Sequence, residues 1–305
     1  MISQAELDHF YEALVSSVQA RGGVCAITSG MACVEYGVAQ STKDCDILCS
    51  ADSVAMLLDL LAETEFAGTA CSYRGHLTAP LDARWMCGGW TAHFAWKSAE
   101  ATAHLDVFGI APRGSSDWMR GRRGLLAGMH TVAEMKRTDR AKDWPFATAL
   151  GVKLLEEGNL DGWLHIFDAD ALRQAVLTAP LPDEIVRRRP VLQLLVQNDP
   201  RLRVGVFGET LFWQNLDRVR LDLHEAAVRK YLKAVRHDPD ADASDLRTQH
   251  RVRVGHAEVL LPRSPLVEYG IERLIEEARR RTAEFVVPGA LEWLPDATAN
   301  FYGLE

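Results

Sequence analysis

The pattern of apolar residues changes along this chain, and that change restricts the possible folds more than any single motif does. Within the first 110 residues, amphipathic helical stretches alternate with short β-prone runs, and residues 69–107 read as a meander of short strands. After residue 131 the apolar positions recur at helical spacing and are interrupted by prolines. The sequence therefore predicts an α+β fold, in which a mixed sheet flanked by helices precedes a mostly helical C-terminal part.

The expected elements fall into two groups. In the first group we expect helices at 3–20, 31–36 and 54–66 and strands at 24–28, 44–49, 71–73, 84–86, 91–96 and 103–108. In the second we expect helices at 131–157, 168–178, 183–197, 215–236 and 265–284, with short β-like pieces at 204–207 and 258–261. The change from mixed to mainly helical patterns places a domain boundary between residues 125 and 160. The sequence therefore predicts two domains, residues 1–150 and residues 151–305.

Composition and charge exclude several classes of protein. The 305 residues include 34 basic and 42 acidic side chains, and both halves carry a small acidic excess, which argues against a protein that coats nucleic acid through its overall charge. The N-terminus has no signal-peptide pattern, and no apolar run approaches the length of a membrane span, so we expect a cytoplasmic, soluble protein. Motifs of zinc hydrolases, serine hydrolases, P-loop enzymes and Rossmann folds do not occur.

The six cysteines all lie in the first third of the chain, mostly inside apolar runs, and no C-x-x-C pair occurs among them: Cys25, Cys33, Cys45, Cys49, Cys71 and Cys87. This distribution is typical of reduced thiols in a core, and it does not fit a disulfide framework or a zinc site.

The residues that point to chemistry lie at the end of the first expected strand and at the start of the second. Ser29 and Gly30 stand where a strand turns into a short helix, a place where a hydroxyl and backbone N–H groups can hold a phosphate. Asp44 and Asp46 open the next strand. Because residues i and i+2 of a strand project from the same face, their carboxylates converge.

Asp106 is the third candidate, because it interrupts an apolar run in which a buried, unpaired carboxylate would be costly. If its strand lies beside the strand of Asp44 and Asp46, three carboxylates share one patch and require a neutralising cation. Ligands that are all oxygen select Mg²⁺ or Mn²⁺. The D-x-D pattern alone occurs four times in the chain, so the context of this first pair distinguishes it.

Together these residues resemble a known family. Ala26-Ile-Thr-Ser-Gly30, Thr42-Lys-Asp-Cys-Asp-Ile47 and Leu105-Asp-Val107 are similar to the motifs of the nucleotidyltransferase superfamily with the DNA polymerase β-like fold. The T-K-D-x-D-I motif is most similar to that of the bacterial minimal and AbiEii-like toxin nucleotidyltransferases, and residues 133–143 resemble their helical motif. The resemblance covers roughly residues 20–150. The turn departs from the family in reading Thr-Ser-Gly, and Phe146 stands where the family has an aspartate.

The resemblance implies roles for individual residues. Asp44 and Asp46 would bind the metal ions, and Asp106 would complete the metal site and help to deprotonate the acceptor. The residues expected to hold the nucleotide are Ser29, Gly30, Thr42, Lys43, Lys136 and Lys142.

The activity that the resemblance implies is an Mg²⁺- or Mn²⁺-dependent transfer of a nucleoside monophosphate from a nucleoside triphosphate to a hydroxyl or phosphate acceptor. The acceptor would be tRNA, another macromolecule or a small molecule, and the toxin-like wording implies an antitoxin partner. Two alternatives remain open: a non-catalytic module of the same fold that binds a nucleotide or a protein, and a metal-dependent phosphoesterase.

Overall fold

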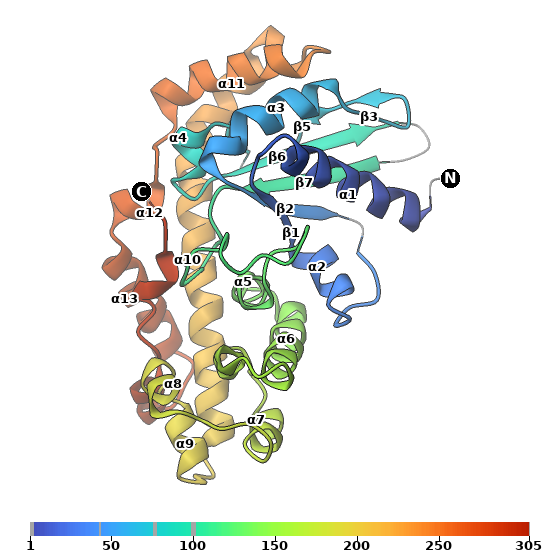
Figure 1. The fold of residues 1–305 in the computed structure, drawn as a ribbon. Helices are drawn as coiled ribbons and strands as arrows, with labels where there is room; N and C mark the ends of the chain where they lie inside the picture. Colours follow the sequence, from blue (N-terminus) through green and yellow to red (C-terminus); the bar gives the residue numbers. More distant parts are fainter. Residues whose placement is uncertain (1–2, 43, 76–77, 99–101, 305) are drawn as a thin grey trace.

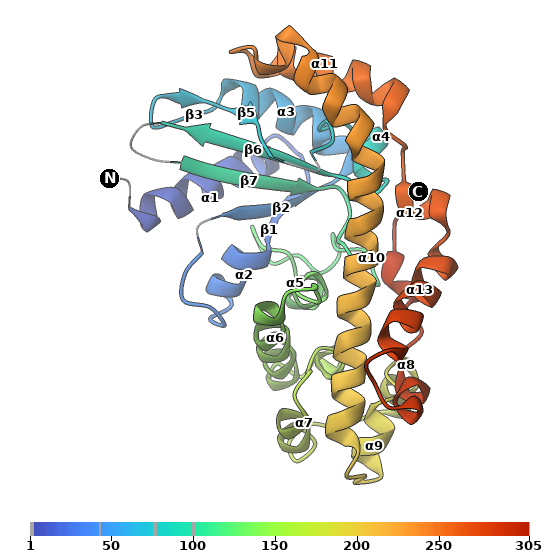
Figure 2. The same cartoon turned by 180° about the vertical axis from the view of Figure 1, so that it is seen from behind.

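A long helix runs along the whole molecule and joins a sheet at one end to a bundle of shorter helices at the other (Figures 1 and 2). This helix is α10 (Leu202–His237), whose 36 residues span about 54 Å at about 1.5 Å per residue. The structure is a computed structural model that describes residues 3–42, 44–75, 78–98 and 102–304. None of the helices in these ranges is both long and apolar enough to cross a membrane.

The principal sheet is mixed, as the sequence predicts, and it has five strands. Their order is β1 (Cys25–Thr28), β2 (Cys45–Cys49), β7 (Thr102–Phe108), β6 (Thr91–Lys97) and β5 (Ser72–Tyr73). β2 and β7 run parallel, and the other neighbours are antiparallel. A separate two-stranded sheet is formed by β3 (Glu65–Phe66) and β4 (Thr69–Ala70).

Helices cover both faces of the sheet because its central strands are apolar on both sides. On one face, α1 (Gln4–Ala20) and α3 (Val54–Glu63) share a core with Ile47 of β2. On the other face, α2 (Ser29–Glu35), α5 (Met129–Met135) and α6 (Trp144–Glu156) share a core with Leu48, the next residue. Consecutive strand residues point to opposite faces, so Asp46 lies on the side of α2 and α5.

The remaining helices build the second half of the molecule. They are α7 (Ala169–Ala175), α8 (Asp183–Arg188), α9 (Leu192–Val196), α11 (Leu246–Leu260), α12 (Pro265–Tyr269) and α13 (Ile271–Ala283). Short 3₁₀ turns are Ala51–Ser53, Ala141–Asp143, Leu160–Leu164, Pro239–Asp242, Pro288–Trp293 and Thr298–Phe301. α13 packs along α10, whereas α11 contacts α3 and β5 at the sheet end.

Several expected elements were wrong. Residues 84–86 belong to a short helix, α4 (Ala83–Met86), because Asp82 caps its first turn and the consecutive residues Trp85 and Met86 are both buried. The β-like piece at 204–207 lies inside α10, and that at 258–261 is the last turn of α11 followed by its extended C-cap, Leu261; packing against neighbouring helices overrides local β propensity there.

Three expected helices are each broken into two. The expected helix at 131–157 is divided into α5 and α6, 183–197 into α8 and α9, and 265–284 into α12 and α13. The last break falls at Gly270, whose φ of 97° is left-handed and ends a helix.

The expected domain boundary at residue 150 falls inside α6. Leu150 and Leu154 of this helix join the core beneath the sheet, whereas Leu155 packs against the helical end with Trp163 and Leu172. One helix thus contributes to both cores. The division into residues 1–150 and 151–305 stays a prediction.

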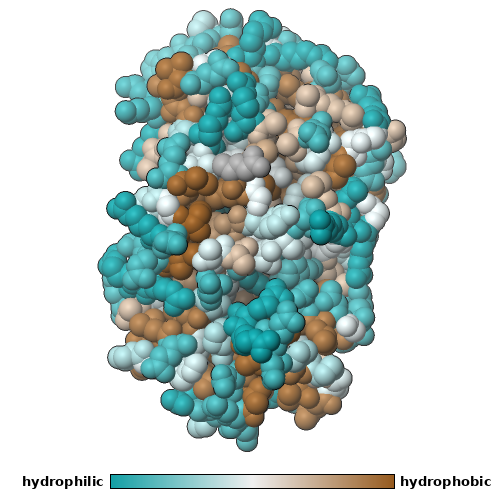
Figure 3. Space-filling model, turned by 60° about the vertical axis from the view of Figure 1, so that its left-hand side comes forward, coloured by the Kyte–Doolittle hydropathy of each residue, from teal (hydrophilic) through white to brown (hydrophobic). Residues whose placement is uncertain are grey.

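The cysteines lie mostly in the core, and the surface is mixed in hydropathy. Five of the six cysteines are buried and reduced, as their positions in apolar runs predict, and Cys87 is partly exposed. On the face drawn in Figure 3, hydrophobic residues form small patches separated by hydrophilic ones.

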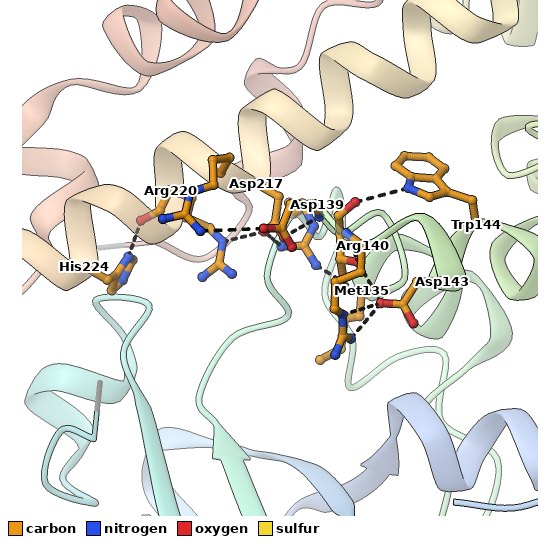
Figure 4. Close-up of polar contacts among 11 residues, drawn as sticks. Met135, Asp139, Arg140, Asp143, Trp144, Asp217, Arg220 and His224 are labelled. Atoms are coloured by element: carbon orange, nitrogen blue, oxygen red, sulfur yellow. Dashed lines mark hydrogen bonds and ion pairs between the residues drawn. The ribbon is translucent and has the colours of Figure 1, made fainter. Parts of the chain in front are cut away.

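A buried ion cluster ties α10 to the segment between α5 and α6 (Figure 4). The carboxylate of Asp217 on α10 pairs with Arg113, accepts a hydrogen bond from Arg220 Nε at 3.0 Å, and accepts another from the backbone N–H of Asp139 at 3.0 Å. Arg113 also donates to the carbonyl of Met135 at 2.7 Å. Burial opposes the ionised form, yet the charges of Arg113 and Arg220 hold the pKa of Asp217 below its ordinary value.

We predict that Asp217→Asn lowers the free energy of unfolding by about 3–5 kcal/mol, because it leaves the Arg113 guanidinium buried without a counter-charge. The side chains of Arg113 and Asp217 are only 3% and 2% exposed. Urea unfolding monitored by circular dichroism measures the change. Asp222→Asn is the matched control on the same helix, since Asp222 pairs with Arg218 and Arg281 at the surface, and it should cost less than about 1 kcal/mol. Equal losses for the two variants would contradict the cluster's structural role.

Candidate active site

Two carboxylates are placed side by side by the parallel pairing of β2 and β7. Asp46 and Asp106 are register partners across these strands, and Thr28 of β1 is the partner of Asp46 on its other side. Neighbouring strands lie about 4.8 Å apart. Asp44 stands two residues before Asp46 and therefore starts from the same face of the sheet. The sequence analysis made a shared carboxylate patch depend on these two strands lying side by side, and they do.

These carboxylates open into a cavity of about 480 Å³. Eight of the nine residues proposed from the sequence line it: Ser29, Gly30, Thr42, Asp44, Asp46, Asp106, Lys136 and Lys142. The ninth, Lys43, lies outside the described residues. The cavity is completed by Cys33, Ala39, Ser41, Arg140, Asp143 and Phe146.

The turn after β1 has a strained geometry. Ser29 has a φ of 53°, the left-handed region in which a residue other than glycine costs roughly 1–2 kcal/mol. Gly30 allows a close approach of Thr42, since a Cβ at this position would lie 2.5 Å from the Thr42 hydroxyl oxygen and would force that side chain to shift. The turn is therefore pressed against Thr42, and its strain is of the kind that often accompanies a functional site.

The electrostatics of the cavity favour a cation beside Asp46. Burial raises the pKa of Asp46 to about 6, and the neighbouring charge of Asp106 adds to the shift. A hydrogen bond from Ser29 and the positive charge of Lys136 oppose the increase without cancelling it. The ionised form of this carboxylate is thus incompletely compensated by the protein.

Asp106 lies beside two side chains from the β5 and β6 edge of the sheet. Arg74 Nη2 lies 2.6 Å from Asp106 Oδ1, and His93 Nδ1 lies 2.8 Å from the same oxygen. His93 is the register partner of Asp106 on β6, and Arg74 also donates from Nε to the carbonyl of Phe94 at 3.0 Å. The hydrogen bond from Arg74 holds Oδ1 toward the β6 side of the strand, whereas His93 Nδ1 is close to this oxygen without the geometry of a hydrogen bond.

Asp44 differs from the other two carboxylates in being largely exposed. Its side chain is 60% exposed, and its Oδ1 lies 3.1 Å from Nδ1 of His104. Within the described ranges, no three metal-ligating side chains are close enough together to hold an ion in their present positions. Asp46 and Asp106 offer the adjacent oxygen donors that Mg²⁺ prefers, and Asp44 would join them by turning away from His104.

Basic residues line the opposite wall of the cavity. Lys136, which follows α5, is buried, and its Nζ lies 3.7 Å from Asp143 Oδ1 and above the ring of Phe146. Asp143 is also bound by Arg140, at 2.6 Å from its Nη2. Lys142 is exposed at the rim. This wall carries positive charge toward the carboxylates.

Sequence reasoning did not identify Arg74, His93 and His104 as parts of the site. No local motif marks them, because only the registers of β6 and β7 bring His93 beside Asp106. Arg140 and Asp143 lie inside the segment that resembles the family's helical motif, so the same signal could have found them.

Comparisons of the chain with protein-family models, with curated proteins and with solved structures found no significant match.

Proposed function

We propose that this protein is a divalent-metal-dependent nucleotidyltransferase, with a sheet of the polymerase β-like kind, that moves a nucleoside monophosphate from a nucleoside triphosphate to a hydroxyl or phosphate acceptor. The observation that carries the proposal is the register pair of Asp46 and Asp106 facing Lys136 across one cavity. A carboxylate pair opposite a buried lysine, next to a tight Ser-Gly turn, suits a triphosphate bound through metal ions.

The transfer is an in-line displacement at the α-phosphorus. The bond from the acceptor oxygen to this phosphorus forms, the bond to the bridging oxygen of the β-phosphate breaks, and pyrophosphate leaves. Two Mg²⁺ or Mn²⁺ ions, when bound, stabilise the attacking and the leaving oxygens. Asp44, Asp46 and Asp106 would hold these ions, and a carboxylate oxygen of Asp106 would accept the acceptor's proton.

The other residues of the cavity position the triphosphate. The N–H groups and the hydroxyl of the Ser29-Gly30 turn would bind the β- and γ-phosphates beside Thr42. Lys136 would supply a fixed charge from the cavity wall, and Lys43 and Lys142 would add charge at the rim. Arg74 would keep Asp106 in one orientation, since a preorganised group needs no reorganisation during reaction.

The acceptor is part of the same proposal. We include tRNA, another macromolecule and a small molecule, with an antitoxin as protein partner in a cytoplasmic setting. Because the whole chain has a formal net charge of −8, attraction of a polyanionic acceptor would depend on bound metal and on local arginines and lysines.

We predict that Asp46→Asn and Asp44→Asn each reduce labelling from an α-³²P nucleoside triphosphate by at least about a hundredfold, because each removes a charge that holds the metal ions. The exposed Asp52, on the turn before α3, provides the control Asp52→Asn, which should label as the wild type does. Release of pyrophosphate identifies transfer. Release of orthophosphate, or labelling unchanged in the Asp46 variant, would contradict the proposed function.

We also predict a pH-dependent stability difference at Asp46 in metal-free buffer. The folded pKa of about 6 lies above the ordinary value of 3.8, so the native state binds this proton more tightly, and wild-type stability falls as pH rises through 6. Asp46→Asn cannot lose that proton. It should therefore be more stable than the wild type by about 1–3 kcal/mol at pH 7.5 and nearly equal to it at pH 4.

Urea unfolding at pH 4, 6 and 7.5 in the presence of EDTA measures this difference. Addition of Mg²⁺ at pH 7.5 should then stabilise the wild type and leave Asp46→Asn unchanged, since only the wild type gains a bound ion. A difference between the two proteins that is the same at every pH would rule out the raised pKa.

A further inference from the structure

A second cavity, of about 350 Å³, lies on the other side of the end of α5. It is bounded by α5, α8, the N-terminal part of α10 and the segment 295–300; Figures 1 and 2 show α8 near the N-terminal end of α10 and α5 closer to its middle. Glu134 and Arg137 line this cavity, whereas Lys136, between them, lines the candidate active site. The proposed transferase reaction uses none of the residues that line this second cavity.

Arg137 is the central feature of the second cavity. The residue is only 4% exposed. No carboxylate oxygen of a described residue lies within 4.0 Å of its guanidinium nitrogens. Nη2 donates to the carbonyl of Leu164 at 3.2 Å and lies 3.0 Å from Nδ1 of His165. Nε is buried without a partner among the described residues. An unpaired buried charge is costly, so this position favours an anion.

The nearest carboxylates on the cavity wall are already bound elsewhere. Glu134 accepts hydrogen bonds from the backbone N–H of Ser115 at 3.1 Å and from its hydroxyl at 2.5 Å. Glu209 is held by Arg189, whose Nε and Nη2 lie 3.0 and 2.8 Å from its oxygens. Neither carboxylate forms an ion pair with Arg137, although the charge of each stabilises the charged guanidinium from a longer distance.

Trp213 supplies a second donor without an acceptor. The residue is buried and lines the cavity, its ring lies 4.8 Å from the Arg137 guanidinium, and its Nε1 has no hydrogen-bond partner in the part of the chain that the structure describes. Arg187 and Arg188 stand exposed at the mouth. The cavity thus brings together a buried guanidinium, a buried indole N–H and the exposed Arg187, and a phosphoryl group has several oxygens that can accept hydrogen bonds from such donors.

The total charge of the lining limits the size of the anion. Four arginines are matched by four acidic residues: Arg137, Arg187, Arg188 and Arg189 against Glu134, Glu184, Glu209 and Asp296. A lining without net charge does not attract a polyanion such as nucleic acid over a distance. The volume of this second cavity, about 350 Å³, lies in the range of pockets that bind small molecules.

We propose that this cavity is a binding site for a small phosphate-bearing molecule, whose phosphoryl oxygens accept hydrogen bonds from Arg137 and Trp213 at the base and from Arg187 at the mouth. The site is separate from the proposed transferase site, and its existence does not depend on that activity.

The test follows the indole N–H signals of the full chain in ¹⁵N-HSQC spectra during titration with inorganic phosphate and, separately, with glycerol 3-phosphate. The Trp213 signal is assigned by its loss in Trp213→Phe. Two other indoles serve as internal references: Trp144, which donates to Thr138 beside the candidate active site, and Trp163, which donates to Pro180. We expect the Trp213 signal to shift saturably while that of Trp163 stays unchanged.

Variants separate a built site from nonspecific attraction. Arg187→Ala should weaken the phosphate affinity by at least about threefold, whereas Arg229→Ala, an exposed arginine of α10 outside the cavity, should not. Arg137→Gln should abolish the Trp213 shift with the other indole signals in place. If Arg137→Gln does not fold, the comparison of Arg187→Ala with Arg229→Ala still decides the question.

The outcomes distinguish the two cavities and the two phosphate sources. A shift with glycerol 3-phosphate but not with inorganic phosphate assigns the site to a phosphorylated metabolite, and a shift with both assigns it to the phosphoryl group alone. A Trp213 signal that moves with neither, or a shift confined to Trp144, would overturn the proposal, because phosphate would then bind only at the candidate active site or not at all.

Discussion

The parallel pairing of β2 with β7 is the constraint on which the rest of the site depends. It places Asp46 and Asp106 on adjacent strands, on the face covered by α2 and α5, where water is partly excluded. Two like charges in such a place raise the free energy of the folded protein, and the surrounding residues reduce that cost. Arg74, which follows β5, pairs with Asp106. The positive charge of Lys136 on the cavity wall stabilises the ionised form of Asp46. The remaining imbalance is what makes a divalent cation a fitting occupant.

The opposite wall of the site is positioned by the helical half of the molecule. Asp217 of α10 holds Arg113 and the backbone of Asp139, and through them the segment that carries Lys136, Arg140 and Asp143. The long helix therefore contributes to the site without lining it. Because successive residues at a helix end point in different directions, Lys136 and Arg137 serve two different cavities, and the end of α5 is a wall common to both.

Local patterns predicted most elements of the sheet and its covering helices, because their apolar periodicity is strong. They were wrong where tertiary packing decides. Residues 84–86 look β-prone, but Asp82 caps a helical turn there and Trp85 is buried against the helical half. Residues 204–207 lie inside α10, whose length results from its contacts along both ends of the molecule. Gly270 ends a helix that periodicity alone would continue.

The sequence by itself determined which residues could form the site: two aspartates at i and i+2, a third in an apolar run, and a Ser-Gly turn after a strand. These are local features, and the two-residue period of a strand is sufficient to place Asp44 and Asp46 on one face. Only the tertiary structure decided that β7 lies beside β2 in the register that joins Asp46 to Asp106, that Arg74 pairs with Asp106, and that Arg137 is buried without an ion pair among the described residues. Strand order, register and burial arise from contacts between residues far apart in the chain, which no local pattern encodes.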